Sequence, residues 1–215
     1  LACASATLTT VQSQDNVGQY SSVTIGSDGL PLISYYDATN GDLRVAHCTD
    51  VACTTATALT LDQAGLVGQF PSMTIGTDGR GLISYYDATN GDLKVAHCDD
   101  VVCSSAKITT LVSKGNVGQF TSITVGADGL GLISYYDVTN QDLKVAHCVD
   151  LVCGSATEST LDSRGNVGQH SSVTIGSDGL GLISYYDATS DDLKVAHCVD
   201  LACSSGRVNT LHSKD

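Results

Sequence analysis

The sequence predicts an all-β fold made of four small antiparallel sheets arranged head to tail, and three observations support this. The 215-residue chain repeats every 50 residues without insertion or deletion, with Leu-Ile-Ser-Tyr-Tyr-Asp beginning at Leu32, Leu82, Leu132 and Leu182. No window carries apolar residues at helical spacing. Glycine- and aspartate-containing turn sequences separate short runs that are rich in β-branched residues, leucine and tyrosine.

Each repeat is expected to contain four strands joined by tight turns. In the first repeat these strands are predicted at residues 22–25, 30–36, 43–48 and 56–61. The turn sequences between them are Ser27-Asp28-Gly29, then Asn40-Gly41, then the loop from Cys48 to Cys53.

Four short strands in a repeat of about 50 residues are typical of a β-propeller blade. One blade cannot bury both of its faces, so stability has to come from stacking on its neighbours. The alternative architecture is an open superhelical stack of the same sheets. The predicted repeats are 16–65, 66–115, 116–165 and 166–215, preceded at 1–15 by an orphan copy of the fourth strand.

The repeated string Leu-Ile-Ser-Tyr-Tyr-Asp-Ala-Thr-Asn-Gly-Asp-Leu-Lys-Val-Ala-His, complete at residues 82–97, resembles a known repeat type. It is similar to the SYYD…NGDLKYA repeats of secreted and surface proteins of bacteria and archaea. That resemblance covers all four units and implies a propeller and a secreted or cell-surface location. The chain departs from the pattern by its added cysteine pair and by Val-Ala-His, where an aromatic residue is common.

Composition excludes several classes of protein. With 42% hydrophobic and 15% charged residues, the chain does not have the composition of a disordered polyelectrolyte. A net charge of −13 argues against nucleic-acid partners, whose phosphates are bound by lysine and arginine. No apolar run approaches the roughly 20 residues of a membrane span, and the first ten residues do not resemble a signal peptide.

Eight of the nine cysteines form four pairs at Cys-x4-Cys spacing, each at the turn between the third and fourth strands. In an oxidising compartment each pair forms a local disulfide, whereas in a reducing one His47, Cys48 and Cys53 supply part of a zinc site. The acidic composition and the resemblance favour disulfides. The predicted bridges are Cys48–Cys53, Cys98–Cys103, Cys148–Cys153 and Cys198–Cys203, which leaves Cys3 unpaired.

The loop from Asp37 to Asp42 has two interpretations. Aspartate and asparagine favour turns by accepting backbone hydrogen bonds, but several oxygens in one loop also suit calcium. The spacing does not match a known calcium loop, so the turn is favoured, and no cofactor or other metal is expected.

Histidine and tyrosine recur at fixed positions. His47 and its three repeat equivalents are expected to be packed, with one ring nitrogen bonded to a neighbouring blade. The Tyr35-Tyr36 pair and its copies are assigned to the core, because tyrosine is the main large aromatic in a chain that has no tryptophan.

Two functions are compatible with this pattern. The favoured one is an extracellular structural or assembly module whose partners are other copies of itself or adjoining repeats. The alternative is a multivalent lectin-like propeller that binds surface glycans or peptides through one weak site per blade. That site would use a recurrent set expected to be exposed: Tyr36, Asp37, Asn40, Asp42, Tyr86, Asp87, Asn90, Asp92, Tyr136, Asp137, Asn140, Asp142, Tyr186, Asp187 and Asp192.

The chain is not expected to be an enzyme. Hydrolysis needs carboxyl groups whose pKa values are separated by different surroundings, whereas exact repetition predicts equivalent surroundings. Catalysis would have to rest on residues that break the repeat, such as Arg80, Glu158 or His170, and none of these has an evident partner.

The two ends of the chain start and stop at the same phase of the repeat. Leu1-Ala2-Cys3 matches Leu201-Ala202-Cys203, so there are five copies of the fourth strand but four of the others. A spare edge strand tends to pair with another chain. The expectation is therefore a segment of a longer array, or a subunit that joins a neighbour and builds a fibre.

Overall fold

The computed structural model describes residues 8–212, and within that range it contains sixteen strands and no helix. The strands form four separate antiparallel sheets of four, each in sequence order, so the predicted all-β array of four blades is confirmed. The strands are β1 (Val17–Ile25), β2 (Pro31–Asp37), β3 (Asp42–Cys48), β4 (Ala56–Asp62), β5 (Val67–Ile75), β6 (Gly81–Asp87), β7 (Asp92–Cys98), β8 (Ala106–Val112), β9 (Val117–Val125), β10 (Gly131–Asp137), β11 (Asp142–Cys148), β12 (Ala156–Asp162), β13 (Val167–Ile175), β14 (Gly181–Asp187), β15 (Asp192–Cys198) and β16 (Gly206–His212).

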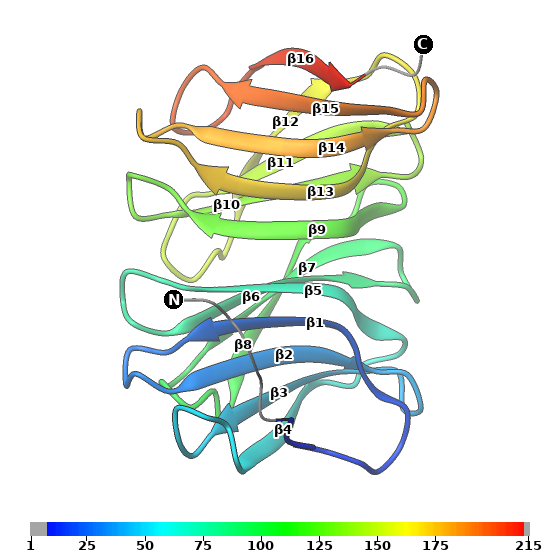
Figure 1. Ribbon diagram of the computed structural model, residues 1–215. Helices are drawn as coiled ribbons and strands as arrows, with labels where there is room; N and C mark the ends of the chain where they lie inside the picture. The colour runs from blue at the N-terminus through cyan, green and yellow to red at the C-terminus, as the bar shows by residue number, and fades with distance from the viewer. Residues whose placement is uncertain (1–7, 213–215) are drawn as a thin grey trace.

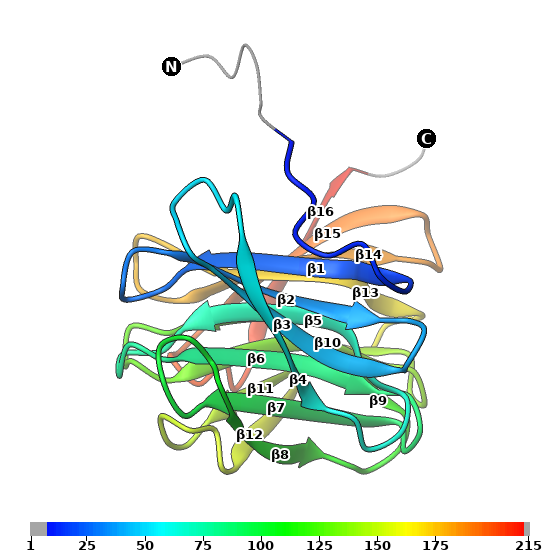
Figure 2. The same cartoon turned by 90° about the horizontal axis from the view of Figure 1, so that it is seen from below.

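The sheets fan out from their first strands. Strands β1, β5, β9 and β13 lie side by side, with β2, β3 and β4 of the first sheet below them and β14, β15 and β16 of the fourth above (Figure 1). Strands β8 and β12 lie on the side of the molecule away from β1 and β13 (Figure 2). Each sheet contacts the next mainly through the first two strands, which is the arrangement of propeller blades around an axis.

The first strand of each blade begins earlier than the sequence indicated. Strand β1 starts at Val17 instead of residue 22, because a bulge between Gln19 and Ser22 lets pairing with β2 continue. Tyr20 lies in this bulge with φ of 54°, and the same irregularity recurs in β5, β9 and β13. A bulge breaks the two-residue alternation that sequence analysis relies on.

Glycine allows the sheets to approach one another closely. A Cβ atom placed on Gly68 of β5 would lie 2.5 Å from the Cα atom of Leu43 in the preceding sheet. Leu43 is fully buried there, together with Leu32 and Val67, in the core between the first two sheets. Equivalent cores form between the second and third sheets and between the third and fourth.

The array is open at both ends. Val23 of the first sheet is 64% exposed, whereas its equivalents Met73, Ile123 and Val173 are 6%, 6% and 7% exposed. Leu193 of the fourth sheet is 47% exposed, whereas Leu43, Leu93 and Leu143 are fully buried. Within residues 8–212 the first and fourth sheets do not pack against each other as the neighbouring sheets do.

The described part of the segment before the first sheet does not show the orphan strand that the sequence predicted at 1–15. Residues 8–16 contain no strand, and no third strand of another blade pairs with them within the described residues. Cys3 and the rest of the predicted segment lie outside the described residues.

Candidate functional site

The four predicted disulfides are confirmed. Each bridge joins residues five apart, with Cα atoms separated by 4.8 to 4.9 Å, across the turn between the third and fourth strands of a blade. The first cysteine of each pair is fully buried, and Cys98, Cys148 and Cys198 lie in the cores between neighbouring blades. The cysteine sulfurs are therefore bonded to each other and do not form half of a zinc site.

Asp37 closes the turn between β2 and β3. Its Oδ1 accepts hydrogen bonds from the backbone N–H groups of Thr39 and Asn40, at 3.0 and 3.1 Å, and its Oδ2 accepts one from the Asn40 amide at 2.9 Å. Burial alone would raise the pKa of Asp37, but these hydrogen bonds and the one from Arg44 outweigh it, so the pKa is lowered. The turn interpretation is confirmed, and both carboxylate oxygens are already occupied by donors.

The predicted binding set is not uniformly exposed, so that expectation is wrong. In the first blade Tyr36, Asp37 and Asp42 are only 7%, 0% and 9% exposed, while Asn40 is exposed. The second sheet packs against the first, and the turn hydrogen bonds hold the Asp37 carboxylate inward. In the next two blades the tyrosine hydroxyl donates to an asparagine at the start of the following blade, Asn116 or Asn166. Binding by this set stays a prediction.

Three of the four histidines are buried and His197 is partly exposed, and their partners differ from the expected ones. Each histidine Nε2 lies 2.8 Å from an aspartate Oδ2 of its own sheet, not of a neighbouring blade. The aspartate follows the first strand, and a backbone hydrogen bond from Leu30 together with the His47 contact lowers the pKa of Asp28. The four pairs are His47–Asp28, His97–Asp78, His147–Asp128 and His197–Asp178.

An aromatic ladder runs along the innermost strands, and sequence analysis missed it. We use this name for Tyr20, Phe70, Phe120 and His170, whose ring centroids are separated by 4.5, 4.6 and 4.1 Å in that order. All four have φ between 51° and 54°, a strained conformation for an aromatic residue. The signal was an aromatic or imidazole ring after each Val-Gly-Gln, but these residues lay outside the predicted strands.

A buried carboxylate joins the first two blades. Asp62 accepts a hydrogen bond from the Tyr85 hydroxyl at 2.7 Å and pairs with the Lys94 ammonium, both on the second sheet. Burial alone would raise the pKa of Asp62, but the bonds from Lys94 and Tyr85 lower it overall. Asp162 makes the same contacts with Tyr185 and Lys194 between the third and fourth blades.

At the interface between the second and third blades, the buried tyrosine hydroxyl has a different acceptor. Val112 replaces the aspartate, and the Tyr135 hydroxyl donates instead to Glu158, at 3.0 Å, on its own sheet. Glu158 and His170, which lacked an evident partner in the sequence, therefore both have one: Glu158 bonds Tyr135, and His170 packs on Phe120. The repeats are alike in backbone but not in the chemistry of their interfaces.

Solved structures identify the architecture. No known family model matches the chain, and no curated protein is significantly similar in sequence. A Hadza microbial sialidase superposes with a TM-score of 0.68 at 14% identity, covering 90% of this chain and 46% of the sialidase. The four sheets are therefore arranged as in a β-propeller.

Two further neighbours have the same propeller architecture. An α-L-arabinofuranosidase from Lactobacillus brevis has a TM-score of 0.58 at 11% identity, covering 88% of this chain and 71% of that one. An exo-β-1,3-galactanase from Phanerochaete chrysosporium, solved with β-1,3-galactotriose, has a TM-score of 0.60 at 12% identity, covering 91% and 49%. At these identities the likeness concerns the fold.

The expectation that the chain is not an enzyme is overturned by these neighbours. They are glycoside hydrolases and a sialidase, so a propeller of such sheets is an enzyme-related fold. Exact repetition would give every carboxyl group equivalent surroundings. The surroundings are not equivalent, because Asp62, Val112 and Asp162 occupy one repeat position and each end blade leaves one face uncovered.

Proposed function

We propose that this protein is an extracellular structural module that is built into a larger assembly through its two end sheets. The observation that carries the proposal is the contrast between Leu193 and its three buried equivalents. Each internal sheet covers both of its faces, whereas the first and fourth sheets each leave one uncovered. Adjoining repeats or further copies are the partners that this geometry suits.

Each of those two faces carries exposed apolar residues whose equivalents in the internal sheets are less exposed. Val23 and Ile25 lie on the first sheet, and Leu182 and Leu193 on the fourth, each at least one-third exposed. Apolar patches of this kind mark interaction surfaces in soluble proteins. Assembly would bury these side chains and gain the stabilisation that the internal interfaces already have.

The disulfides support a secreted or cell-surface location. Local disulfides persist in oxidising compartments and are rare in the cytosol. Here four of them brace the turns at the blade edges. None of the described segments is a helix with the length and hydrophobicity needed to cross a membrane.

Side-chain footprinting tests the assembly role. A diffusible carbene reagent should label Val23 and Leu193 strongly in the purified, dilute chain, and weakly in the protein isolated without denaturant from the cells that make it. Val149, 51% exposed on the disulfide loop of the internal third sheet, is the matched control and should be labelled equally in both samples. Equal labelling of all three residues in both samples would contradict the proposal.

A second candidate function is glycan binding, and the aromatic ladder is the observation that favours it. Tyr20 and His170 are exposed, so the ladder offers ring faces on which a sugar ring can stack. Several structural neighbours are named as enzymes that act on glycans. On a glycan array the protein should give signals that the Tyr20→Ala variant loses, whereas signals retained by that variant would assign binding elsewhere.

A further inference from the structure

The interface between blades is built three times with the same hydrogen bond. The hydroxyl of Ser22 accepts the backbone N–H of Met73 at 3.1 Å, and two equivalent bonds follow along the array. Those bonds run from Ile123 to Ser72 and from Val173 to Ser122. By repeat position, the fourth sheet carries an acceptor for a further bond, the hydroxyl of the exposed Ser172. The first sheet carries the matching donor, the backbone N–H of the exposed Val23.

A second polar pair repeats in the same way. The hydroxyl groups of Ser84 and Thr121 lie 2.8 Å apart across one interface, and those of Ser134 and Ser171 lie 2.9 Å apart across the next. Between the first two blades proline occupies the second position, so the buried Ser34 hydroxyl has no partner there. The remaining members of this series are Ser184 on the fourth sheet and Ser21 on the first.

The shapes of the two end faces also match. At each internal interface a leucine backbone lies where a Cβ on the facing glycine would be, as for Leu93 against Gly118 and Leu143 against Gly168. Nothing lies within 4 Å of that position on Gly18 of the first sheet. The leucine that would occupy it by repeat position is the exposed Leu193.

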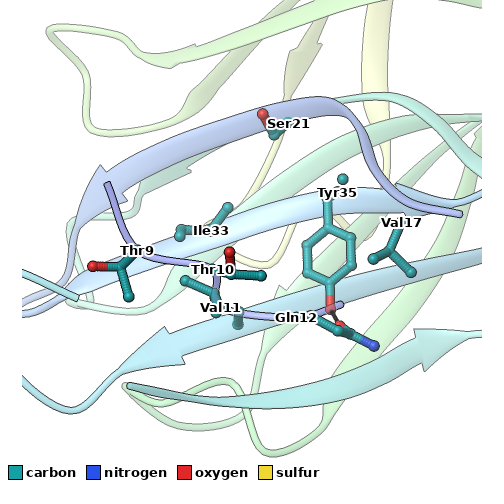
Figure 3. A pocket seen from close by; sticks show the side chains of 10 residues that line it. Thr9, Thr10, Val11, Gln12, Val17, Ser21, Ile33 and Tyr35 are labelled. Carbon is teal, nitrogen blue, oxygen red and sulfur yellow. Dashed lines mark hydrogen bonds between the residues drawn. The ribbon is translucent and has the colours of Figure 1, made fainter. Parts of the chain in front are cut away.

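A hollow of about 370 Å³ lies over the first sheet, where the internal sheets carry a preceding blade. Ile33 and Tyr35 line it (Figure 3), as does Ala46, and the equivalents of all three in the second sheet are fully buried. One side of the hollow is closed by residues 9–12, and the Tyr35 hydroxyl donates to Gln12. Gln12 thus takes the role that Asp62 of a preceding fourth strand has for Tyr85.

We infer that the two end faces are the two halves of a fourth interface, formed when a second copy of this chain docks head to tail. This inference rests on the proposed assembly function and names its partner. The fourth sheet of one copy covers the first sheet of the next, Leu193 meets Gly18, and Ser184 meets Ser21. Strand β16 of the incoming copy replaces residues 9–12 over Tyr35. A second copy is the occupant because both complementary halves lie on this one chain.

One position differs from the internal interfaces. Pro31 stands where Gly81, Gly131 and Gly181 stand in the other blades, and at those glycines a Cβ would lie 2.8 to 3.2 Å from the Cδ2 atom of the preceding leucine. In the head-to-tail contact this atom belongs to Leu182. Since it is the end of a flexible side chain, a small shift accommodates the proline.

Docking of this kind uses different surfaces on the two copies. Such a heterologous contact closes into a ring when the rotation between copies closes, and otherwise continues as a filament. Every added copy leaves the same two faces free at the ends, so assembly does not stop at a dimer unless the ring closes. Residues 9–12 have to leave the first sheet before each docking event.

Mixed-variant cross-linking tests the inference. One chain carries Ser21→Cys and the other Ser184→Cys, both with Cys3→Ser to remove the unpaired thiol. Mixed under mild oxidation, they should form a heterodimer linked between the two new cysteines, as mapped by mass spectrometry. A chain with both Ser134→Cys and Ser171→Cys is the positive control, because these hydroxyls are already 2.9 Å apart and should cross-link within the chain.

Each single variant alone is the negative control and should give far less dimer than the mixture, because a two-fold contact is not expected. A mixture that stays monomeric while the positive control cross-links would overturn the inference. So would a chain carrying both Ser21→Cys and Ser184→Cys that cross-links only internally, since it would then close on itself. If footprinting finds the end faces covered but this cross-link fails, the assembly function stands and its partner is another protein.

Discussion

Replacing Leu93 with alanine is expected to lower the free energy of unfolding by about 3 kcal/mol. Leu93 is fully buried between the second and third sheets, in a core with Val95, Val117 and Tyr135. Its Cα atom lies 2.8 Å from the position a Cβ on Gly118 would take, so the facing sheet is already in close contact and cannot collapse far into the cavity. Urea denaturation followed by circular dichroism measures the loss.

Leu193→Ala is the matched control, because the same residue occupies the same repeat position on the fourth sheet. It is 47% exposed, so its truncation should cost less than about 1 kcal/mol in the dilute chain. Where copies stack head to tail, this cost should rise towards that of Leu93→Ala. Equal costs in a dilute monomer would mean that the array closes and that its end faces are not free.

The fold was predictable because its signals are local and repeated. Gly and Asp turn sequences at fixed phase delimited the strands, and the spacing of Cys48 and Cys53 across one turn predicted a bridge that the structure contains. Stacking followed from the size of the unit, since a sheet of about 50 residues cannot bury both faces. These inferences required no knowledge of which side chains meet across an interface.

The details of the candidate site depend on which side chains meet across the turns and interfaces, and the sequence pattern does not show this. Periodicity does not indicate a bulge, so the start of β1 and the direction of the Tyr20 ring were not predicted. Burial of Asp37 follows from contacts made by the turn and by the next blade, which residue type alone does not reveal. His47 bonds Asp28 because antiparallel pairing brings the end of β3 beside the turn after β1.

The repeat symmetry of the sequence does not give the blades equivalent surroundings. Treating all repeats as equivalent suggested equivalent sites, but the sheets at the ends have only one neighbour each. The interfaces differ as well, since a carboxylate joins the first two blades and a valine stands at the equivalent position between the next two. A chain of near-identical repeats can therefore hold groups with quite different surroundings.

Replacing Asp62 with valine should destabilise the protein by about 3 kcal/mol, because it leaves two buried polar groups without their main partner. The Tyr85 hydroxyl would lose its acceptor, and the Lys94 ammonium would keep only Asp87, at 3.8 Å. Valine itself should fit, since Val112 is buried at the same position of the next interface.

Acid should reduce this difference between the wild type and Asp62→Val. The pKa of Asp62 is lower in the folded chain than its usual value, so the carboxylate stabilises the fold above the unfolded pKa of about 4. That contribution is lost as the pH falls through the lower folded pKa. Urea denaturation at neutral pH and at successively lower pH measures both the loss and its convergence.

The middle interface supplies the compensating change. There Glu158 on the third sheet accepts the hydrogen bond from Tyr135 in place of an aspartate from the second sheet. Its repeat equivalent on the second sheet is Ile108, which packs at the edge of the core between the first two sheets.

Combining Asp62→Val with Ile108→Glu should give Tyr85 a new acceptor on its own sheet. The double variant should therefore be more stable than the sum of the single losses predicts, with a coupling of about 1–2 kcal/mol. Ile108→Glu alone should be destabilising, because it places a second carboxylate beside Asp62. Strictly additive losses would mean that the exchange between Asp62 and Glu158 positions is coincidental and that each tyrosine hydroxyl is satisfied in some other way.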